Sequence, residues 1–358
     1  MESEGEHPRV VLGTMTMGDA YADMRSHDAC VLEQAAMVRE YWERFPLHRG
    51  EATIDTARYY RNEAHVAAVV EKARVSVKWS SKANPWAGND FTSGAFGGLS
   101  ERAFESQLTA SLRHCPALDT YFLHAPDAET SLEETLAAVD RAHRAGRFRQ
   151  WGLSNFSLEQ CERISDICAA RGYAHPAVYQ GMYNVFCRQV ECIFPWIRQH
   201  GMSFWAYNPL LGGLVCTSRP SPSPPRREPT MMQRWFNWLW KCHSSKDTET
   251  DTDTETETTR KGRFSNPIYQ KLFLRPGLVA ACASIPPDQG VRMALLWLRD
   301  HSCLRSTDAV VLGASSLAQL QENMDVWQFG APLSEEEVRR LDMAHAAIPM
   351  ADRPAYFY

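Results

Sequence analysis

The sequence predicts an α/β fold in which eight parallel strands close into a barrel with helices outside, a (β/α)8 TIM barrel. Two observations lead to this prediction. Short apolar runs that end at polar or turn residues alternate with segments of helical period, which is typical of buried parallel strands and their crossover helices. The alternation continues through eight units, which is enough to close a barrel.

The expected elements follow one another along the chain. Strands are expected at residues 9–17, 53–56, 75–82, 118–124, 148–153, 177–180, 203–207 and 309–312. Helices are expected at residues 28–45, 63–73, 100–114, 131–146 and 189–200. A serine followed three residues later by Glu or Gln, the pattern of a capping box, marks helix starts at Ser131–Glu134, Ser157–Gln160, Ser316–Gln319 and Ser334–Glu337. The last of these is expected to open a C-terminal extra helix beyond the eighth unit.

Residues 217–259 interrupt the alternation between the seventh and eighth units. This segment holds a Pro-rich stretch, a group of aromatic residues and an alternating run of Thr and acidic residues. Low-complexity stretches of this kind bury too little surface to offset chain entropy, so we expect a disordered insert. Local packing of its aromatic residues, or no role for them, is favoured over a membrane or partner contact. Because its composition resembles nothing that flanks it, translated intron is a further hypothesis.

The composition is that of an ordinary globular protein and limits the classes of partner that we expect. The chain has 358 residues, of which 44% are hydrophobic and 23% charged. Its ten cysteines form no C-x-x-C pair and no apolar leader precedes Arg9, so we expect a cytoplasmic protein with no metal site. The formal net charge is -5, and it becomes +1 without the six acids of 247–257. A near-neutral body and the lack of a long apolar run give no reason to expect nucleic acid or membrane as partner.

Three polar residues, Asp55, Lys82 and His124, each close one of three consecutive apolar runs. Carboxyl ends of neighbouring parallel strands meet at one edge of the sheet, where α/β folds place their chemistry. Tyr60 follows five residues after Asp55. A phenol has an ordinary pKa of about 10, so it needs a neighbouring cation to act as an acid or base at neutral pH. We expect Lys82 to be that cation, Asp55 to hold it, and His124 to orient a carbonyl oxygen.

Each of these residues has an ordinary structural role when taken alone. An aspartate at a strand end often caps a helix, a lysine is usually solvated, and a loop histidine is usually hydrogen-bonded to its surroundings. The joint placement of all three on consecutive strand ends favours catalysis over these separate roles.

These residues belong to a set of seven short sequence motifs that occur in a characteristic order along the chain. They are Ile54-Asp55-Thr56-Ala57 with Tyr60, Lys82-Ala83-Asn84-Pro85-Trp86, Leu123-His124-Ala125-Pro126-Asp127, Gly152-Leu153-Ser154-Asn155, Val178-Tyr179-Gln180-Gly181-Met182-Tyr183-Asn184, Ala206-Tyr207-Asn208-Pro209-Leu210 with Gly212-Gly213, and Leu312-Gly313-Ala314-Ser315-Ser316. In these stretches the chain resembles the aldo-keto reductases, and most of all the branch of aflatoxin-aldehyde and succinic-semialdehyde reductases. The resemblance runs from about residue 9 to residue 358 apart from the insert, which implies a single barrel domain over 1–358.

The resemblance implies an NADPH cofactor in an extended pose. It implies a catalytic tetrad of Asp55, Tyr60, Lys82 and His124, with Tyr60 as the proton donor. At the nicotinamide it implies contacts from Ser154, Asn155 and Gln180 to the carboxamide and from Tyr207 to the ring. At the pyrophosphate it implies contacts from Asn208, Pro209, Leu210, Gly212 and Gly213, with Arg263 near the cofactor. At the 2′-phosphate it implies contacts from Gly313, Ser315, Ser316, Gln319 and Asn323. Small residues before a helix suit a phosphate, although a Ser-Ser cap without a ligand fits them equally well. No G-x-G-x-x-G follows the first strand, which argues against a Rossmann site.

The chain departs from the family on both sides of the insert. Residues 215–219 stand where the family has a short Thr-Gly-Lys loop. Tyr269 matches a tyrosine of the branch that contacts acidic aldehydes, but Leu272 stands where the branch has an arginine. Since a bidentate partner for a carboxylate is lost, succinic semialdehyde is not expected as the substrate. Trp86, which follows the Lys82 strand end, is expected to line an apolar or aromatic pocket.

These observations predict an NADPH-dependent oxidoreductase that reduces small carbonyl substrates, aldehydes or ketones, to alcohols. Two alternatives stay open. One is a non-catalytic NADPH-binding partner module, like the channel-associated subunits of the superfamily. The other is a pseudoenzyme impaired by the insert. A homodimer also stays open.

Overall fold

The computed structural model describes residues 7–18, 27–44, 52–86, 98–216 and 271–357. Within them, eight parallel strands form a closed barrel in sequence order, which confirms the predicted fold class. The strands are β1 (Arg9–Gly13), β2 (Thr53–Asp55), β3 (Lys78–Ala83), β4 (Leu118–Leu123), β5 (Gln150–Ser154), β6 (Val178–Met182), β7 (Ser203–Tyr207) and β8 (Ala309–Leu312). The barrel closes where β1 pairs with β8, with Val10 opposite Val310.

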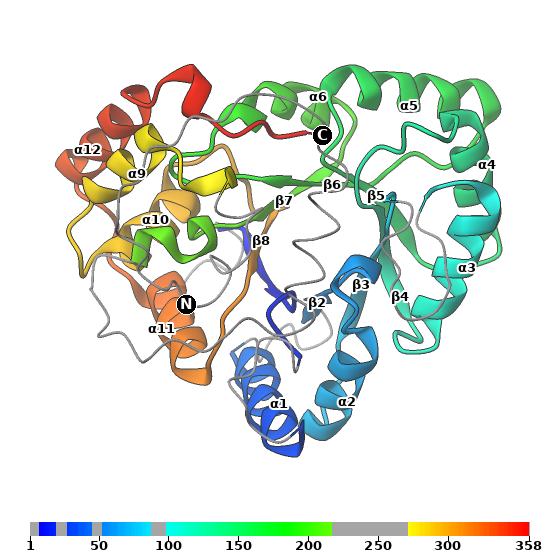
Figure 1. Ribbon diagram of the computed structural model, residues 1–358, viewed down its shortest axis with the longest axis horizontal. Coiled ribbons are helices and arrows are strands. Elements are labelled where there is room, and N and C mark those ends of the chain that lie inside the picture. Colours follow the sequence, from blue (N-terminus) through cyan, green and yellow to red (C-terminus); the bar gives the residue numbers. More distant parts are fainter. Residues whose placement is uncertain (1–6, 19–26, 45–51, 87–97, 217–270, 358) are drawn as a thin grey trace, which may run out of the picture.

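The helices surround the barrel, as Figure 1 shows. They are α1 (His27–Glu43), α2 (Glu63–Ala73), α3 (Glu101–Leu112), α4 (Leu132–Arg144), α5 (Leu158–Arg171), α6 (Phe194–Gln199), α9 (Pro276–Ala283), α10 (Gly290–Asp300), α11 (Leu317–Phe329) and α12 (Glu335–Ala346). Short 3-10 turns are η3 (Arg58–Tyr60), η4 (Gln189–Ile193), η5 (Leu211–Cys216) and η7 (Met350–Asp352). None of the helices in the described ranges is long and apolar enough to cross a membrane. The insert predicted at 217–259 lies outside the described residues.

The predicted helix starts are confirmed, but the capping box is incomplete at two of them. At Ser316 the hydroxyl caps α11, while the Gln319 side chain bonds to Ser315 and does not complete the box. The Ser157 and Ser334 side chains each form a complete capping box, and α12 is the predicted C-terminal extra helix. The Ser131 hydroxyl caps α4, but the box predicted there is wrong. The Glu134 carboxylate instead accepts a hydrogen bond from the backbone N–H of Glu101, on the neighbouring α3. A tertiary partner therefore competes for the side chain that the local pattern assigned to the cap.

Two further differences concern the second half of the chain. The segment predicted as one helix over 189–200 begins as the 3-10 turn η4 and continues as α6. Helices α9 and α10, which lie between the insert and β8, have no counterpart in the prediction. α10 carries an almost unbroken buried run from Met293 to Arg299, so it packs as an interior helix and not as a half-exposed one.

The barrel interior is filled by apolar side chains from β1, β4, β6, β7 and β8. A compact group of Val11, Phe122, Val178, Trp205, Ala309 and Val311 occupies it. The rings of Phe122 and Trp205 meet edge to face, with centroids 5.5 Å apart. Gly152 makes room for this packing, because a Cβ there would come within 2.5 Å of the Phe122 ring. The interior is thus a packed core that supports the residues at its carboxyl-end mouth.

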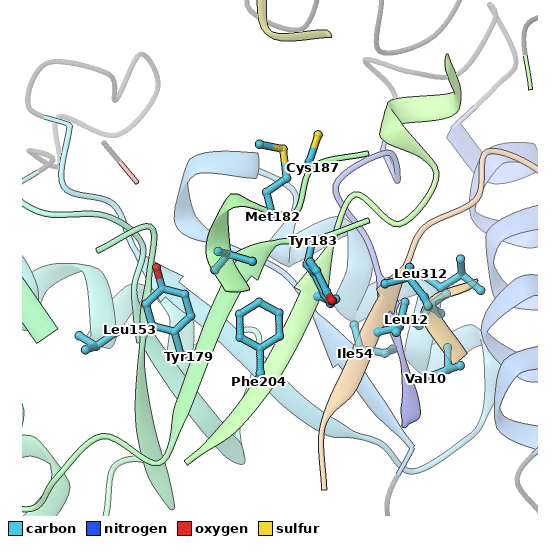
Figure 2. Close-up of a cluster of buried hydrophobic side chains, with 14 of the residues drawn as sticks. Val10, Leu12, Ile54, Leu153, Tyr179, Met182, Tyr183, Cys187, Phe204 and Leu312 are labelled. Atoms are coloured by element: carbon cyan, nitrogen blue, oxygen red, sulfur yellow. The ribbon is translucent and has the colours of Figure 1, made fainter. Parts of the chain in front are cut away.

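The outer face of the barrel packs against the helices through a larger apolar core. Figure 2 shows Tyr179 and Phe204 side by side on neighbouring strands, and Leu12 near Leu312 where the barrel closes. The Tyr179 and Phe204 rings stack with centroids 5.8 Å apart. The Tyr179 hydroxyl donates to the carbonyl of Phe156 at 2.7 Å, so this large ring is buried with its polar atom satisfied.

The amino-terminal end of the barrel depends on the buried carboxylate of Asp308, immediately before β8. This carboxylate forms an ion pair with Arg198 at 2.5 Å and accepts backbone N–H bonds from Phe204 and Arg305, each at 2.7 Å. It thereby joins α6, β7 and the approach to β8 at one point. Removal of one partner from a buried pair leaves the other charge uncompensated.

We therefore predict that Asp308→Ala lowers the free energy of unfolding by about 3–5 kcal/mol, measured by urea denaturation. The matched control is Glu133→Ala. It breaks the ion pair between Glu133, whose side chain is 46% exposed, and Arg163, whose side chain is 64% exposed. Its expected cost is below about 1 kcal/mol. Equal losses in the two variants would contradict the role assigned to Asp308.

Candidate active site

A buried ion pair joins the carboxyl end of β2 to β3. The Lys82 ammonium lies 2.5 Å from the Asp55 carboxylate and donates to the carbonyl of Thr56 at 2.8 Å. The Lys82 and Asp55 side chains are 0% and 2% exposed. The second oxygen of Asp55 accepts hydrogen bonds from the Ser80 hydroxyl at 2.8 Å and the Gln180 amide at 3.1 Å. The sequence thus correctly predicted that Asp55 and Lys82 lie together.

Burial and neighbouring charges have opposite effects on the pKa of Lys82. Burial lowers the pKa of Lys82, while attraction to Asp55 and, more weakly, Glu63 raises it. The net pKa is lowered from the ordinary value. A lysine held in this way is a fixed cation in a site that excludes water, where its electrostatic effect on a neighbouring group is strong.

Tyr60 stands next to this cation on the turn η3. The Lys82 ammonium is 5.3 Å from the centroid of the Tyr60 ring, and the Tyr60 and His124 ring centroids are 5.9 Å apart. The Tyr60 N–H donates to the carbonyl of Ala57 at 3.0 Å. Arg61 ends the turn in the left-handed region at φ 57°. The structure therefore brings the phenol, the ammonium and the imidazole to one place.

His124 follows β4 and is held by its backbone. Its N–H donates to the carbonyl of Ala83 at 3.1 Å, and its carbonyl accepts from the Asn155 amide at 2.9 Å. Burial, and then repulsion from Lys82, lowers the pKa of His124 well below its usual value. Among the described residues its buried Nδ1 has no hydrogen-bond partner. The imidazole is therefore neutral near pH 7, with one ring nitrogen as a donor and the other as an acceptor.

Aromatic rings line one side of this group. The Tyr59 and Trp86 ring centroids are 5.0 Å apart, and those of Trp86 and His124 are 5.3 Å apart. Tyr59 also meets His124 edge to face at 6.1 Å. The sequence predicted Trp86 in such a pocket, but Tyr59 was missed. The adjacency of Tyr59 to Tyr60 on a tight turn was the one signal that could have found it.

Polar groups continue around the mouth on β5, β6 and β7. The Tyr207 hydroxyl donates to the side-chain oxygen of Asn155 at 2.7 Å, and the Asn155 amide donates to the Ser154 hydroxyl at 3.0 Å. Asn155 is in the left-handed region at φ 63°. Together with Gln180 on β6, these groups form an edge of amides and hydroxyls beside Lys82 and His124. Such an edge fits a planar carboxamide with an aromatic ring next to it.

The loop after β7 is shaped by backbone conformation. Asn208, Leu211, Gly212 and Gly213 all have positive φ, between 51° and 98°. A Cβ added at Gly213 would meet nothing within 4 Å, so open space lies next to this backbone. The Asn208 carbonyl accepts from the Asn184 amide at 3.0 Å, which anchors the start of the loop. Pro209 and Leu210 lie within it, and the loop fits the elongated group that the resemblance implies.

The start of α11 completes the ring of predicted cofactor residues. The Ser316 hydroxyl caps the helix by accepting from the N–H of Gln319 at 3.3 Å. The Gln319 side-chain oxygen accepts from the N–H and hydroxyl of Ser315, at 3.0 Å and 2.7 Å. Ser315 and Gln319 are exposed, whereas Asn323, one turn further, is buried. Gly313 connects this cap to β8.

Most of the predicted site residues therefore converge on the carboxyl-end mouth. Arg263 and Tyr269 lie outside the described residues. Besides Tyr59, the sequence analysis missed Ser80, which holds Asp55. Ser80 lies two positions before Lys82 on the same strand, and alternate residues share a face, so that spacing could have found it. No group of His, Cys, Asp and Glu in the described ranges is arranged to hold a metal ion.

The low pKa of His124 makes stability depend on pH. The folded pKa lies below the unfolded value of about 6.5, so this contribution is complete above pH 6.5 and is lost as the pH falls towards the folded pKa. We predict that His124→Gln reduces the slope of unfolding free energy against pH by up to about 1.4 kcal/mol per pH unit. Urea denaturation between pH 4.5 and 7.5 measures it, with the exposed His301→Gln as control. An unchanged slope in His124→Gln would contradict the prediction.

Known proteins resemble this chain both in sequence and in fold. Residues 9–346 match the Aldo/keto reductase family. The chain is 34% identical over 349 residues to aflatoxin B1 aldehyde reductase member 2 of Mus musculus, covering 94% of this chain and 84% of that protein. It is also 34% identical to aflatoxin B1 aldehyde reductase member 4 of Homo sapiens, covering 94% and 93%. Glycerol dehydrogenase of Gluconobacter oxydans has the same fold, with a TM-score of 0.64, 21% identity and 98% coverage of both chains. This chain therefore belongs to the aldo/keto reductase family and is an oxidoreductase.

Proposed function

We propose that this protein reduces aldehydes or ketones to alcohols with NADPH, and that Tyr60 is the proton donor. The observation that carries the proposal is the meeting of Tyr60, the buried Lys82–Asp55 pair and neutral His124 at one end of the barrel. The aflatoxin-aldehyde reductases supply the expected reaction class by likeness of sequence.

The residues act on the carbonyl oxygen. When bound, the cofactor supplies the hydride that reaches the carbonyl carbon. Tyr60 gives its phenolic proton to the oxygen as negative charge develops there. Lys82 stabilises the resulting phenolate, and Asp55 holds Lys82 in place. His124 donates a hydrogen bond from its neutral ring and orients the oxygen towards Tyr60.

The cofactor is held by residues of this chain that span the mouth. Ser154, Asn155 and Gln180 would bind the carboxamide, and Tyr207 would stack on the nicotinamide ring. The 208–213 loop would hold the pyrophosphate. The start of α11, at Ser315 and Ser316, takes the 2′-phosphate with its hydroxyl groups and helix dipole. Arg263 is proposed to lie near the cofactor on the basis of the resemblance alone.

The substrate class is an apolar or aromatic carbonyl compound. Tyr59 and Trp86 present ring faces and edges beside His124. Leu272, where the branch has an arginine, is partly buried and packs against the apolar core. A leucine in this environment gives a substrate carboxylate no partner, and an unpaired charge there is costly.

The proposal also includes the location and domain organisation of the protein, and it leaves two alternative functions open. No disulfide bond joins two of the described cysteines, in keeping with a reducing cytoplasm. A single barrel domain over 1–358 remains a prediction, and a homodimer stays open. A non-catalytic NADPH-binding module would bind the cofactor without oxidising it. A pseudoenzyme impaired by the insert would gain NADPH binding, in a fluorescence titration, when residues 217–259 are deleted.

We predict that Tyr60→Phe lowers kcat by at least about 100-fold, because the variant retains the ring and loses the proton. The Kd for NADPH, measured by fluorescence titration, is expected to stay within about 2-fold, since Tyr60 serves the carbonyl oxygen. Tyr173→Phe, remote from the site on the loop after α5, is the matched control. Retained turnover in Tyr60→Phe would rule out its role as proton donor.

A second prediction concerns substrate choice. An aromatic aldehyde such as 4-nitrobenzaldehyde is expected to have a kcat/KM at least about 10-fold above that of succinic semialdehyde, because one missing charged contact is worth more than about 1.4 kcal/mol. Trp86→Ala should reduce the value for the aromatic aldehyde and leave that for a short aliphatic aldehyde nearly unchanged. Steady-state NADPH oxidation measures both. A preference for succinic semialdehyde in the unmodified protein would refute the substrate assignment.

A further inference from the structure

A second buried carboxylate lies on the outer side of the barrel wall. Glu63 is the first residue of α2, and its side chain is 2% exposed. One of its oxygens accepts hydrogen bonds from the Ser81 hydroxyl at 2.6 Å and the Ser111 hydroxyl at 2.7 Å. The other lies 2.6 Å from the guanidinium of Arg58. A buried charge with three partners is compensated, and the mechanism proposed above does not use it.

Two of these partners belong to the segments that carry the proton-handling groups. Successive strand residues point to opposite faces. Lys82 therefore meets Asp55 inside the barrel, while its neighbour Ser81 meets Glu63 outside. Arg58 is in the same turn, η3, as Tyr60. One carboxylate thus contacts both the strand of the ammonium and the turn of the phenol.

The surroundings make this contact point rigid. Ser111 belongs to α3, so Glu63 is held by a helix as well as by β3. The far side of the turn is fixed by Asn62, whose amide donates to the carbonyls of Thr14 at 2.7 Å and Met17 at 2.9 Å. The turn that carries Tyr60 is therefore attached at Asn62 to the loop after β1 and at Arg58 to Glu63.

We propose that Glu63 is a positioning residue for the reduction, which sets the placement of Tyr60 relative to Lys82 by holding Arg58 and Ser81 at the same time. This inference rests on the proposed function, because it assigns a task only if Tyr60 is the proton donor. Positional errors of about 1 Å in a reacting group can cost about 100-fold in rate.

The arrangement is also balanced in charge. One ion pair lies on each side of β3, Asp55 with Lys82 inside the barrel and Glu63 with Arg58 outside it. Loss of the Glu63 charge removes an anion close to the turn that carries Tyr60, which favours the phenolate form of Tyr60. Loss of the Arg58 charge has the opposite effect.

Other ionisable groups close to Glu63 do not disturb this balance. Tyr121 on β4 and Cys115 after α3 both have a pKa raised by burial first and by Glu63 second. They therefore stay neutral over the working range. His124, on the far side of Lys82, is neutral as well.

Two single variants and their combination test the proposal in the full chain. Glu63→Gln and Arg58→Met conserve approximate shape and remove one charge each. Each is expected to lower kcat by about 10- to 100-fold, with the Kd for NADPH within about 2-fold. The pH at which carbonyl reduction falls to half should decrease by about one unit in Glu63→Gln and increase by about one unit in Arg58→Met. In the double variant this pH should return close to the original value while kcat stays low.

A second ion pair in the chain provides the control. Glu105 and Arg147 form another partly exposed ion pair, away from the mouth, and Glu105→Gln and Arg147→Met should keep the original kcat and pH midpoint. Lower Tm with unchanged kcat and pH midpoint in the Glu63 and Arg58 variants would show a purely structural role and overturn the inference. If Glu63→Gln does not fold, Arg58→Met decides alone, since its side chain is 20% exposed.

The same experiment separates this inference from the function on which it rests. Tyr60→Phe is assayed alongside. If Tyr60→Phe is inactive and the Glu63 and Arg58 variants match the unmodified protein, the positioning role fails and the proposed function stands. If Tyr60→Phe remains active, the proposed function fails first.

Discussion

The buried pair of Lys82 and Asp55 is the constraint on which the site depends. An ammonium and a carboxylate with almost no exposure are tolerated only when paired and hydrogen-bonded, and each partner comes from a different strand. The register that sets Asp55 opposite Ser80 makes this possible. A slip of one residue between β2 and β3 would turn Lys82 outward and leave Asp55 without its cation. The pairing of the two strands and the chemistry therefore stand or fall together.

Strand β3 is polar on both of its faces, which is unusual for a buried strand. Ser80 and Lys82 face inward to Asp55, and Ser81 faces outward to Glu63. Each polar group finds a partner, so no buried charge is left uncompensated. The apolar packing of the barrel interior lies below this level. The core thus supplies rigidity, and the polar groups on the two faces of β3 hold the reactive groups.

Local pattern predicted much of this site and failed where distant elements compete. Asp55, Lys82 and His124 could be located because apolar runs end at them, and parallel strands bring their carboxyl ends together. The box at Ser131 was wrong because its expected partner bonds to a neighbouring helix instead. The aromatic contact of Tyr59 was missed, since it joins a turn to residues that follow two other strands. Contacts of that kind have no local period.

The sequence by itself determined the eight-unit barrel, the helix caps and the residues at the strand ends, because these follow from hydrophobic period and short-range hydrogen bonding. Only the tertiary structure decided which polar groups share a partner. Glu63 reads in the sequence as an acid in the first turn of a helix. It becomes the common contact of Arg58 and Ser81 only when β3 and the turn η3 both pack next to the start of α2. That arrangement depends on strand register and helix packing, which no single segment encodes.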